Sequence, residues 1–347
     1  MALFSRNGVP SLNPEILARK SADPRRRQLM AMGCGCCLAM MVPMSRAAVE
    51  SPEVARHLLA AKEAAGDDLG SYLVLGNSAL PDYKPPKFSI DDLMRMPAPP
   101  PGKAFDNLYF VGSKWVSTWA IITSDGIILV DAMDNEEEAE RIVDGGMRQL
   151  GLDPSLIKII IVTHGHGDHY GGANYFKRRY NSRIVMSQAD WQMMETKLEF
   201  DFPNWGRPPQ RDIVVGGGDT VRLGDTRVDI LSTPGHTMGT ISLLFPVRRG
   251  SETHQALLWG GTAFNFGRQP DRLRAYIEST ARTREFAQQK GTDVFISNHN
   301  AYDKVVEKLA SMKPAAKNPF VLGAPTVQRA LTVMEECARA TLAAWNA

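Results

Sequence analysis

The densest cluster of potential metal ligands lies in one short loop that directly follows an apolar segment. His164, His166, Asp168 and His169 fall within six residues, immediately after the apolar run 157–162. Imidazole suits zinc, and a single carboxylate in the set favours zinc or iron over magnesium. Alternate residues of an extended chain point to the same side. His164 and His166 can therefore hold one ion, while Asp168 and His169 face a second. Two ions that share a water can hydrolyse a carbonyl compound.

Two further histidines follow the ends of other expected strands. His236 comes after the strand-like segment 228–232, and His299 comes after the segment 293–297. Because strand ends on one edge of a sheet converge, we expect both side chains to join the first cluster. We expect the two remaining histidines of the chain to be packed or solvated: His57 and His254.

The elements that must position these residues alternate between strand-like and helix-like segments. Apolar runs of strand length cover 127–131 and 157–162, and helical patterns cover 135–150 and 271–290. Two such halves predict an α/β (α+β) protein with an αββα sandwich, in which two mixed β-sheets face each other and helices cover the outside.

The composition divides the chain into four segments. Residues 1–47 form a basic and then apolar leader, and 48–104 form a helix and a proline-rich connector. The main domain covers 105–312, and residues 313–347 form a C-terminal loop and helix that pack on this domain.

The leader resembles a twin-arginine (Tat) export signal. Arg25, Arg26 and Arg27 precede an apolar stretch over 29–44, and small residues surround Arg46 at the expected cleavage position. The stretch is too short for a comfortable membrane span. The pattern predicts a periplasmic or secreted protein with no stable membrane association after the signal is removed. The alternative is a basic tail followed by a buried helix.

The charge distribution favours a small-molecule substrate over nucleic acid. The net charge is +2, but residues 1–47 alone carry +5, so the remainder is slightly acidic at −3. Proteins that bind nucleic acid need a basic stripe to contact phosphates. Nothing in the composition specifies an oligomeric state.

The His-x-His-x-Asp-His motif, the Pro-Gly-His turn at 234–236 and the late strand-end histidine together resemble the metallo-β-lactamase superfamily over about residues 105–312. The resemblance implies two zinc ions per chain, one bound by His164, His166 and His236, and one bound by Asp168, His169 and His299. It also implies that Asp168 steers the attacking hydroxide and that Asp131 orients a ligand imidazole.

The residue at one ligand position makes the chain similar to the third (B3-type) zinc β-lactamase subclass. Many superfamily hydrolases carry a bridging aspartate after a glycine, whereas here Gly261 is followed by Thr262. The chain lacks this ligand but keeps His169, as that subclass does. The serines that the subclass often uses near this position appear here as Thr262 and Phe264.

The resemblance implies a zinc-dependent hydrolase in which a metal-bound hydroxide attacks a carbonyl, with a β-lactam-type cyclic amide as the expected substrate. The alternatives are a lactonase, esterase or thioesterase of the same fold, or an iron-dependent sulfur dioxygenase. Residues in loops above the metals, or next to a ligand, are candidates for contacts with the substrate: Trp115, Tyr170, Trp205, Thr262, Phe264, Phe266 and Asn298.

Overall fold

The structure is a computed structural model that describes residues 51–84, 89–314 and 316–346. The export signal expected over residues 1–47 lies outside the described residues. Within the described ranges, no helix combines the length and the apolar character that crossing a membrane requires.

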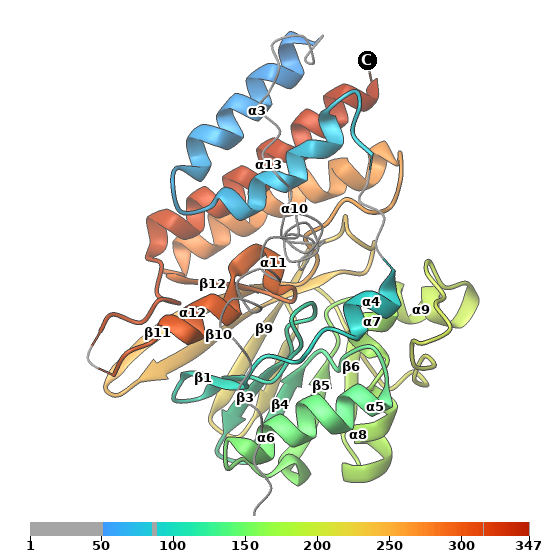
Figure 1. The fold of residues 1–347 in the computed structure, drawn as a ribbon, viewed down its shortest axis with the longest axis vertical. Helices are drawn as coiled ribbons and strands as arrows, with labels where there is room; N and C mark the ends of the chain where they lie inside the picture. The colour runs from blue at the N-terminus through green and yellow to red at the C-terminus, as the bar shows by residue number, and fades with distance from the viewer. Residues whose placement is uncertain (1–50, 85–88, 315, 347) are drawn as a thin grey trace, which may run out of the picture. The chain divides into compact units, whose positions relative to one another are not determined.

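Two mixed β-sheets form the centre of the fold (Figure 1). The first sheet contains seven strands in chain order: β1 (Gly102–Phe105), β2 (Leu108–Phe110), β3 (Trp119–Thr123), β4 (Gly126–Val130), β5 (Ile157–Ile161), β6 (Arg183–Ser187) and β7 (Ile213–Val215). The second contains five strands in spatial order: β12 (Val294–Ser297), β11 (Glu252–Trp259), β10 (Ile241–Arg249), β9 (Thr226–Ser232) and β8 (Thr220–Leu223). The first sheet is antiparallel up to β4 and parallel from β4 to β7, and the second is parallel only between β11 and β12.

The inner faces of the two sheets share one apolar core. Ile128 and Val130 of β4 pack in the same cluster as Leu243 of β10 and Leu258 of β11, and all four side chains are fully buried. Every residue of β4 is buried, which explains why its sequence is a continuous apolar run rather than an alternating pattern.

Helices cover the outer faces of both sheets. On the side of the first sheet lie α5 (Glu136–Glu138), the π-helical turn η3 (Ala139–Asp144), α6 (Gly145–Gln149), α8 (Ala173–Tyr180) and α9 (Gln188–Thr196). On the side of the second sheet lie α3 (Pro52–Ala65), the 3-10 helix η2 (Gly70–Ala79), α10 (Pro270–Gln289) and α13 (Ala324–Asn346). Shorter helices lie in connections: α4 (Ile90–Met94), η4 (Pro154–Leu156), α7 (Gly167–Tyr170), α11 (Asn300–Asp303) and α12 (Val305–Ser311). The arrangement confirms the αββα sandwich.

The second helical layer has an apolar core of its own. Trp259 of β11 and Phe295 of β12 pack there with Tyr276 of α10 and with Leu331 and Met334 of α13. Figure 1 shows α13 between α3 and α10 on the outer side of this sheet. The helices α3, α10 and α13 thus form the layer that packs against the strands preceding His236 and His299.

Candidate metal centre

Six potential ligands meet at the edge of the sandwich where β5, β9 and β12 end. The group consists of His164, His166, Asp168, His169, His236 and His299. The loop is extended only as far as His166, because helix α7 begins at Gly167. Asp168 and His169 therefore reach the centre from a helical turn, which the sequence did not predict.

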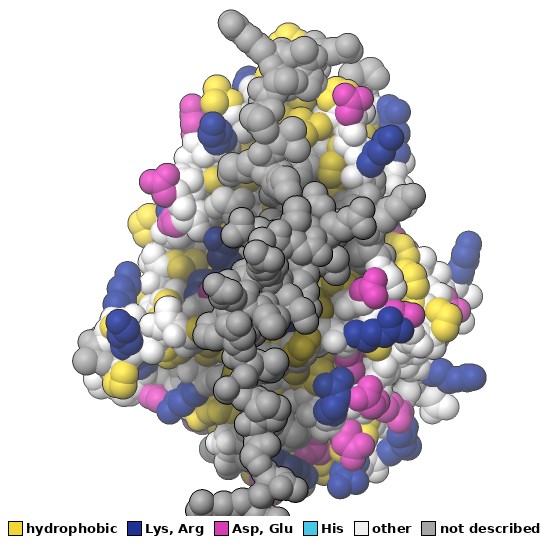
Figure 2. All heavy atoms as spheres, in the orientation of Figure 1, with side chains coloured by type: hydrophobic (Ala, Val, Ile, Leu, Met, Phe, Trp, Pro, Cys, Tyr) yellow, Lys and Arg dark blue, Asp and Glu magenta, His cyan; other side chains and the backbone are white. Residues whose placement is uncertain are grey.

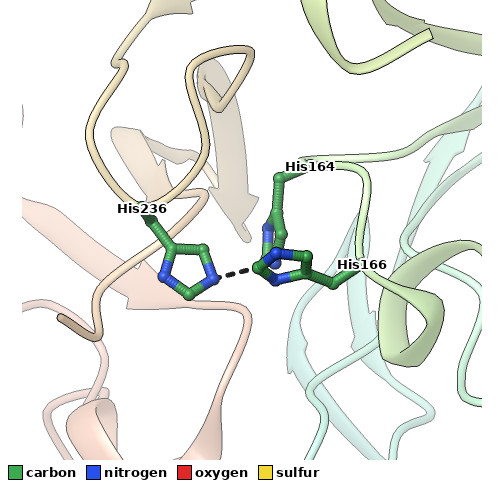
Figure 3. A group of neighbouring side chains, drawn as sticks. All are labelled: His164, His166 and His236. Atoms are coloured by element: carbon green, nitrogen blue, oxygen red, sulfur yellow. Dashed lines mark hydrogen bonds between the residues drawn. The ribbon is translucent and has the colours of Figure 1, made fainter. Parts of the chain in front are cut away.

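The first ligand group is formed by His164, His166 and His236 (Figure 3). The Nε2 atoms of His164 and His236 lie 3.1 Å apart. The ring of His166 stands edge-on to both, with centroid distances of 4.8 Å and 4.9 Å. One ligand atom from each residue lies within 4.8 Å of the others, so a single cation can touch all three.

Backbone carbonyls on the side away from the cluster determine which nitrogen is protonated in two of these rings. The Nδ1 of His164 donates to the Gly260 carbonyl at 2.7 Å, and the Nδ1 of His236 donates to the Ala263 carbonyl at 2.8 Å. A carbonyl can only accept, so each Nδ1 carries the proton and each Nε2 of the neutral ring presents a lone pair. Burial lowers the pKa of both His164 and His236 well below the ordinary value. Two buried lone pairs that face each other repel, and a cation between them removes the repulsion, so this donor set fits a metal ion.

The second ligand group is formed by Asp168, His169 and His299. The Nε2 of His169 lies 3.2 Å from the Oδ2 of Asp168 and 3.2 Å from the Nε2 of His299. The Nδ1 of His299 donates to the Trp115 carbonyl at 3.1 Å, so its Nε2 also faces the group as a lone pair. The ring centroids of His164 and His169 are 4.1 Å apart, which places the two groups side by side.

Asp131 lies directly behind His169, where the sequence analysis expected an orienting carboxylate. Its Oδ2 accepts from the Nδ1 of His169 at 2.8 Å and from the Thr163 hydroxyl at 2.9 Å. Its Oδ1 accepts from the Thr163 amide at 2.8 Å. Burial alone would lower the pKa of His169, but the carboxylates of Asp168 and Asp131 outweigh it and raise this pKa to about 10.

The residues expected to contact the substrate take different positions around the two ligand groups. Trp115 adjoins the second group, with its ring centroid 5.8 Å from that of His299. Tyr170 is fully buried at the end of α7, and burial raises its pKa. The Thr262 hydroxyl is buried and has no hydrogen-bond partner among the described residues. Asn298 donates to Gly260 and Thr163, so it supports the cluster from behind.

The other expected aromatic residues pack against protein elements. Trp205 lies over Gly167, where a Cβ would come within 2.3 Å of its ring, and its Nε1 donates to Asp134 at 2.8 Å. Phe264 packs edge-on against Tyr276 of α10, and Phe266 lies in the same apolar cluster.

Two carboxylates that sequence reasoning missed contact the ligand loops. Asp190 of α9 accepts from the Gly165 amide and from the Thr237 hydroxyl, both at 2.7 Å, and so joins the loops that carry His164 and His236. Glu199 contacts His166 at 3.2 Å. Burial raises the pKa of Glu199, but its bonds to His166 and Arg272 lower it to about 2.

The two histidines expected to be packed or solvated have carboxylate partners outside the cluster. His57 contacts Glu336 at 2.6 Å, and His254 contacts Asp293 at 2.6 Å.

Comparison with known proteins agrees with this fold. Residues 115–250 match the metallo-beta-lactamase superfamily. The structure is similar to BJP-1, a subclass B3 metallo-beta-lactamase of Bradyrhizobium japonicum, with 27% identity, a TM-score of 0.60, and coverage of 69% of this chain and 92% of that one. It has the same fold as FEZ-1 from Legionella gormanii, with 24% identity, a TM-score of 0.60, and coverage of 68% and 93%.

Curated relatives give shorter matches. A hydroxyacylglutathione hydrolase of Rhodopseudomonas palustris (strain BisA53) is 32% identical over 108 residues, which are 31% of this chain and 34% of the relative. One from Xanthomonas axonopodis pv. citri (strain 306) is 31% identical over 165 residues, 47% and 49% of the two chains. The chain thus spans about a third to a half of the length of these relatives. The match of residues 115–250 to the metallo-β-lactamase superfamily is thus consistent with the fold and with the ligand cluster.

Asp131→Asn should weaken the second ligand group while leaving the backbone intact, since asparagine tolerates the left-handed φ of 61° at this position. Thr163 donates to Oδ1, so the amide NH2 would face the Nδ1 of His169. That contact moves the ring proton to Nε2, the atom that faces the second cation. We expect the affinity of the second ligand group for a divalent cation to fall about 10- to 100-fold, as measured by chelator competition.

The matched control is Asp293→Asn, which alters a carboxylate paired with His254 away from the centre. It should leave the affinity for divalent cations unchanged. Equal affinity in the Asp131→Asn variant and the wild-type protein would contradict the role assigned to Asp131.

Proposed function

We propose that the chain is a hydrolase that holds two zinc ions and opens a β-lactam-type cyclic amide. The observation that supports it most directly is the presence of two adjacent ligand groups whose histidines are oriented in advance by hydrogen bonds from behind. The named activity of the structural neighbours, whose chains this one covers almost completely, supports the substrate class.

The donor set favours zinc. Magnesium prefers oxygen ligands, whereas a set of five imidazoles and one carboxylate suits zinc. Zinc would supply a water that is activated near neutral pH and a Lewis acid for the carbonyl oxygen. The proposed ligands of the first ion are His164, His166 and His236, and those of the second are Asp168, His169 and His299.

The residues of the chain bind, orient and exclude water. The ligand side chains His164 and His169 are fully buried, which limits access of bulk water to the centre from the protein side. Asp168 presents its Oδ2 toward both His169 and His299, where a carboxylate can accept a hydrogen bond from an attacking water and set its direction. Asp131 keeps the His169 proton on Nδ1 while the water attacks.

Partly or largely exposed apolar side chains support a cyclic, partly apolar substrate. Phe200 packs edge-on against His166, with a centroid distance of 4.9 Å, and Phe202 packs with it. Met238, two residues after His236, is 56% exposed. On the face seen in Figure 2, basic and acidic side chains of the described residues are interspersed rather than gathered into a basic stripe. This distribution agrees with a small molecule as substrate rather than nucleic acid.

A thioester is the second candidate substrate, because the curated relatives are named hydroxyacylglutathione hydrolases. These relatives match only part of their length, so they support the chemistry of the centre more than the shape of its substrate.

A hydrolysis panel with purified, zinc-loaded protein tests the proposal. We expect turnover of a penicillin, a cephalosporin or a carbapenem to exceed that of an acyl lactone and a glutathione thioester. His166→Ala should reduce kcat/KM at least about 10³-fold, since it removes a ligand that only the first group uses. The proposed function is wrong if the folded His166→Ala variant hydrolyses the panel at the wild-type rate, or if the protein binds iron and consumes oxygen instead.

We further propose that the mature protein is periplasmic or secreted, supported by the twin-arginine pattern at Arg25 and Arg26. Replacing both with lysine keeps the charge but removes the guanidinium pair. We expect the double variant to accumulate as a cytoplasmic precursor, while the wild-type chain is recovered outside the cytoplasm with a new N-terminus near residue 48. Recovery of uncleaved wild-type chain in the cytoplasm would contradict export.

A further inference from the structure

Glu199 connects one proposed ligand to a helix on the opposite sheet. It lies in the loop between α9 and β7, and its side chain is 20% exposed. Its Oε2 lies 3.2 Å from the Nε2 of His166, and its Oε1 accepts from the Nη1 of Arg272. Arg272 belongs to α10 and is 8% exposed.

The contact with Glu199 determines which nitrogen His166 offers to a cation. In the other four histidines of the centre, the Nδ1 is held from behind by a backbone carbonyl or by Asp131, and the Nε2 faces inward. In His166 the Nε2 is occupied by Glu199, so the inward-facing ligand atom is Nδ1. The orientation of His166 therefore depends on a side chain from an outer loop.

Arg272, which donates to Glu199, also contacts the turn that carries His236. Its Nε donates to the Gly235 carbonyl at 2.9 Å, directly before His236. The guanidinium lies over the Phe266 ring at 4.1 Å from the centroid. Gly235 has a φ of 145° and fits closely against Tyr276, where a Cβ would come within 2.6 Å. A single guanidinium on α10 thus restrains two of the three ligands of the first group.

The loop has other anchors that do not involve Glu199. The Nε1 of Trp205 and the amide of Gly206 both donate to Asp134, each at 2.8 Å. Because these contacts hold the loop, removing the Glu199 carboxylate should affect His166 rather than the fold.

We propose that Glu199 and Arg272 form a positioning pair that presents the Nδ1 of His166 and the turn of His236 to the first cation, and thereby sets the affinity of that site. The proposal rests on the metal centre described under the proposed function. It assigns to an outer loop and to α10 a direct influence on metal binding.

Cobalt(II) titration of the purified chain tests the pair, because the visible absorption of cobalt reports ligand geometry independently of hydrolysis. We expect Glu199→Ala to bind its first cobalt about 10- to 100-fold more weakly, with a changed absorption envelope. Glu199→Gln keeps an oxygen that can accept from His166, so it should recover most of the wild-type spectrum. Arg272→Lys keeps the charge but cannot bridge Glu199 and Gly235 together, and should resemble Glu199→Ala in affinity.

The matched control is Glu195→Ala, which removes the ion pair with Arg211 from the same loop region without touching a ligand. Its cobalt affinity and spectrum should equal those of the wild-type chain. Metal-free unfolding midpoints of all variants establish that each is folded, and Glu199→Gln provides the comparison if Glu199→Ala is not.

Two results overturn the proposal in distinguishable ways. If the wild-type chain binds two cobalt ions and Glu199→Ala binds them with equal affinity and an unchanged spectrum, the positioning pair is wrong and the metal centre stands. If the wild-type chain binds no cobalt, the metal centre itself is wrong, and the positioning pair falls with it.

Discussion

The centre depends on one constraint, which is that each ligand histidine is hydrogen-bonded on the nitrogen that faces away from the cluster. Carbonyl groups of Gly260, Ala263 and Trp115 hold three of the rings, and carboxylates hold the other two. When a ring is neutral, as binding of a cation requires, its one proton sits on the outer nitrogen and the inner nitrogen presents a lone pair. The protein thus prepares the electronic state of the ligands as well as their positions.

The fold supplies these acceptors by bringing strand ends and loop backbones very close together. A Cβ on Gly260 would lie 1.9 Å from the Ile241 carbonyl, and one on Gly261 would lie 2.7 Å from the Cβ of His236. A larger residue at either site would displace the backbone that holds His164 or His236. The buried sheet core and the helices α10 and α13 keep these strands from shifting, so distant packing supports local chemistry.

The sequence allowed prediction of the sandwich and of the residues that meet at the strand ends. The apolar runs at 127–131 and 157–162 became β4 and β5 within one residue, because buried parallel strands have continuous apolar sequences. The helical start of α7 was not predicted, since four residues containing Gly167 have no helical periodicity to detect. Glu199 and Asp190 were also missed, because their contacts with the ligand loops depend on the path of a long irregular loop and on the placement of α9.

Anomalous diffraction at the zinc absorption edge, from crystals of the zinc-loaded protein, tests the central claim most directly. Two peaks are expected, each about 2.0–2.2 Å from its ligand atoms. One should contact the Nε2 of His164 and His236 and the Nδ1 of His166, and the other Asp168 and the Nε2 of His169 and His299. A peak bound through the Nε2 of His166, or zinc bound elsewhere with this cluster empty, would contradict it.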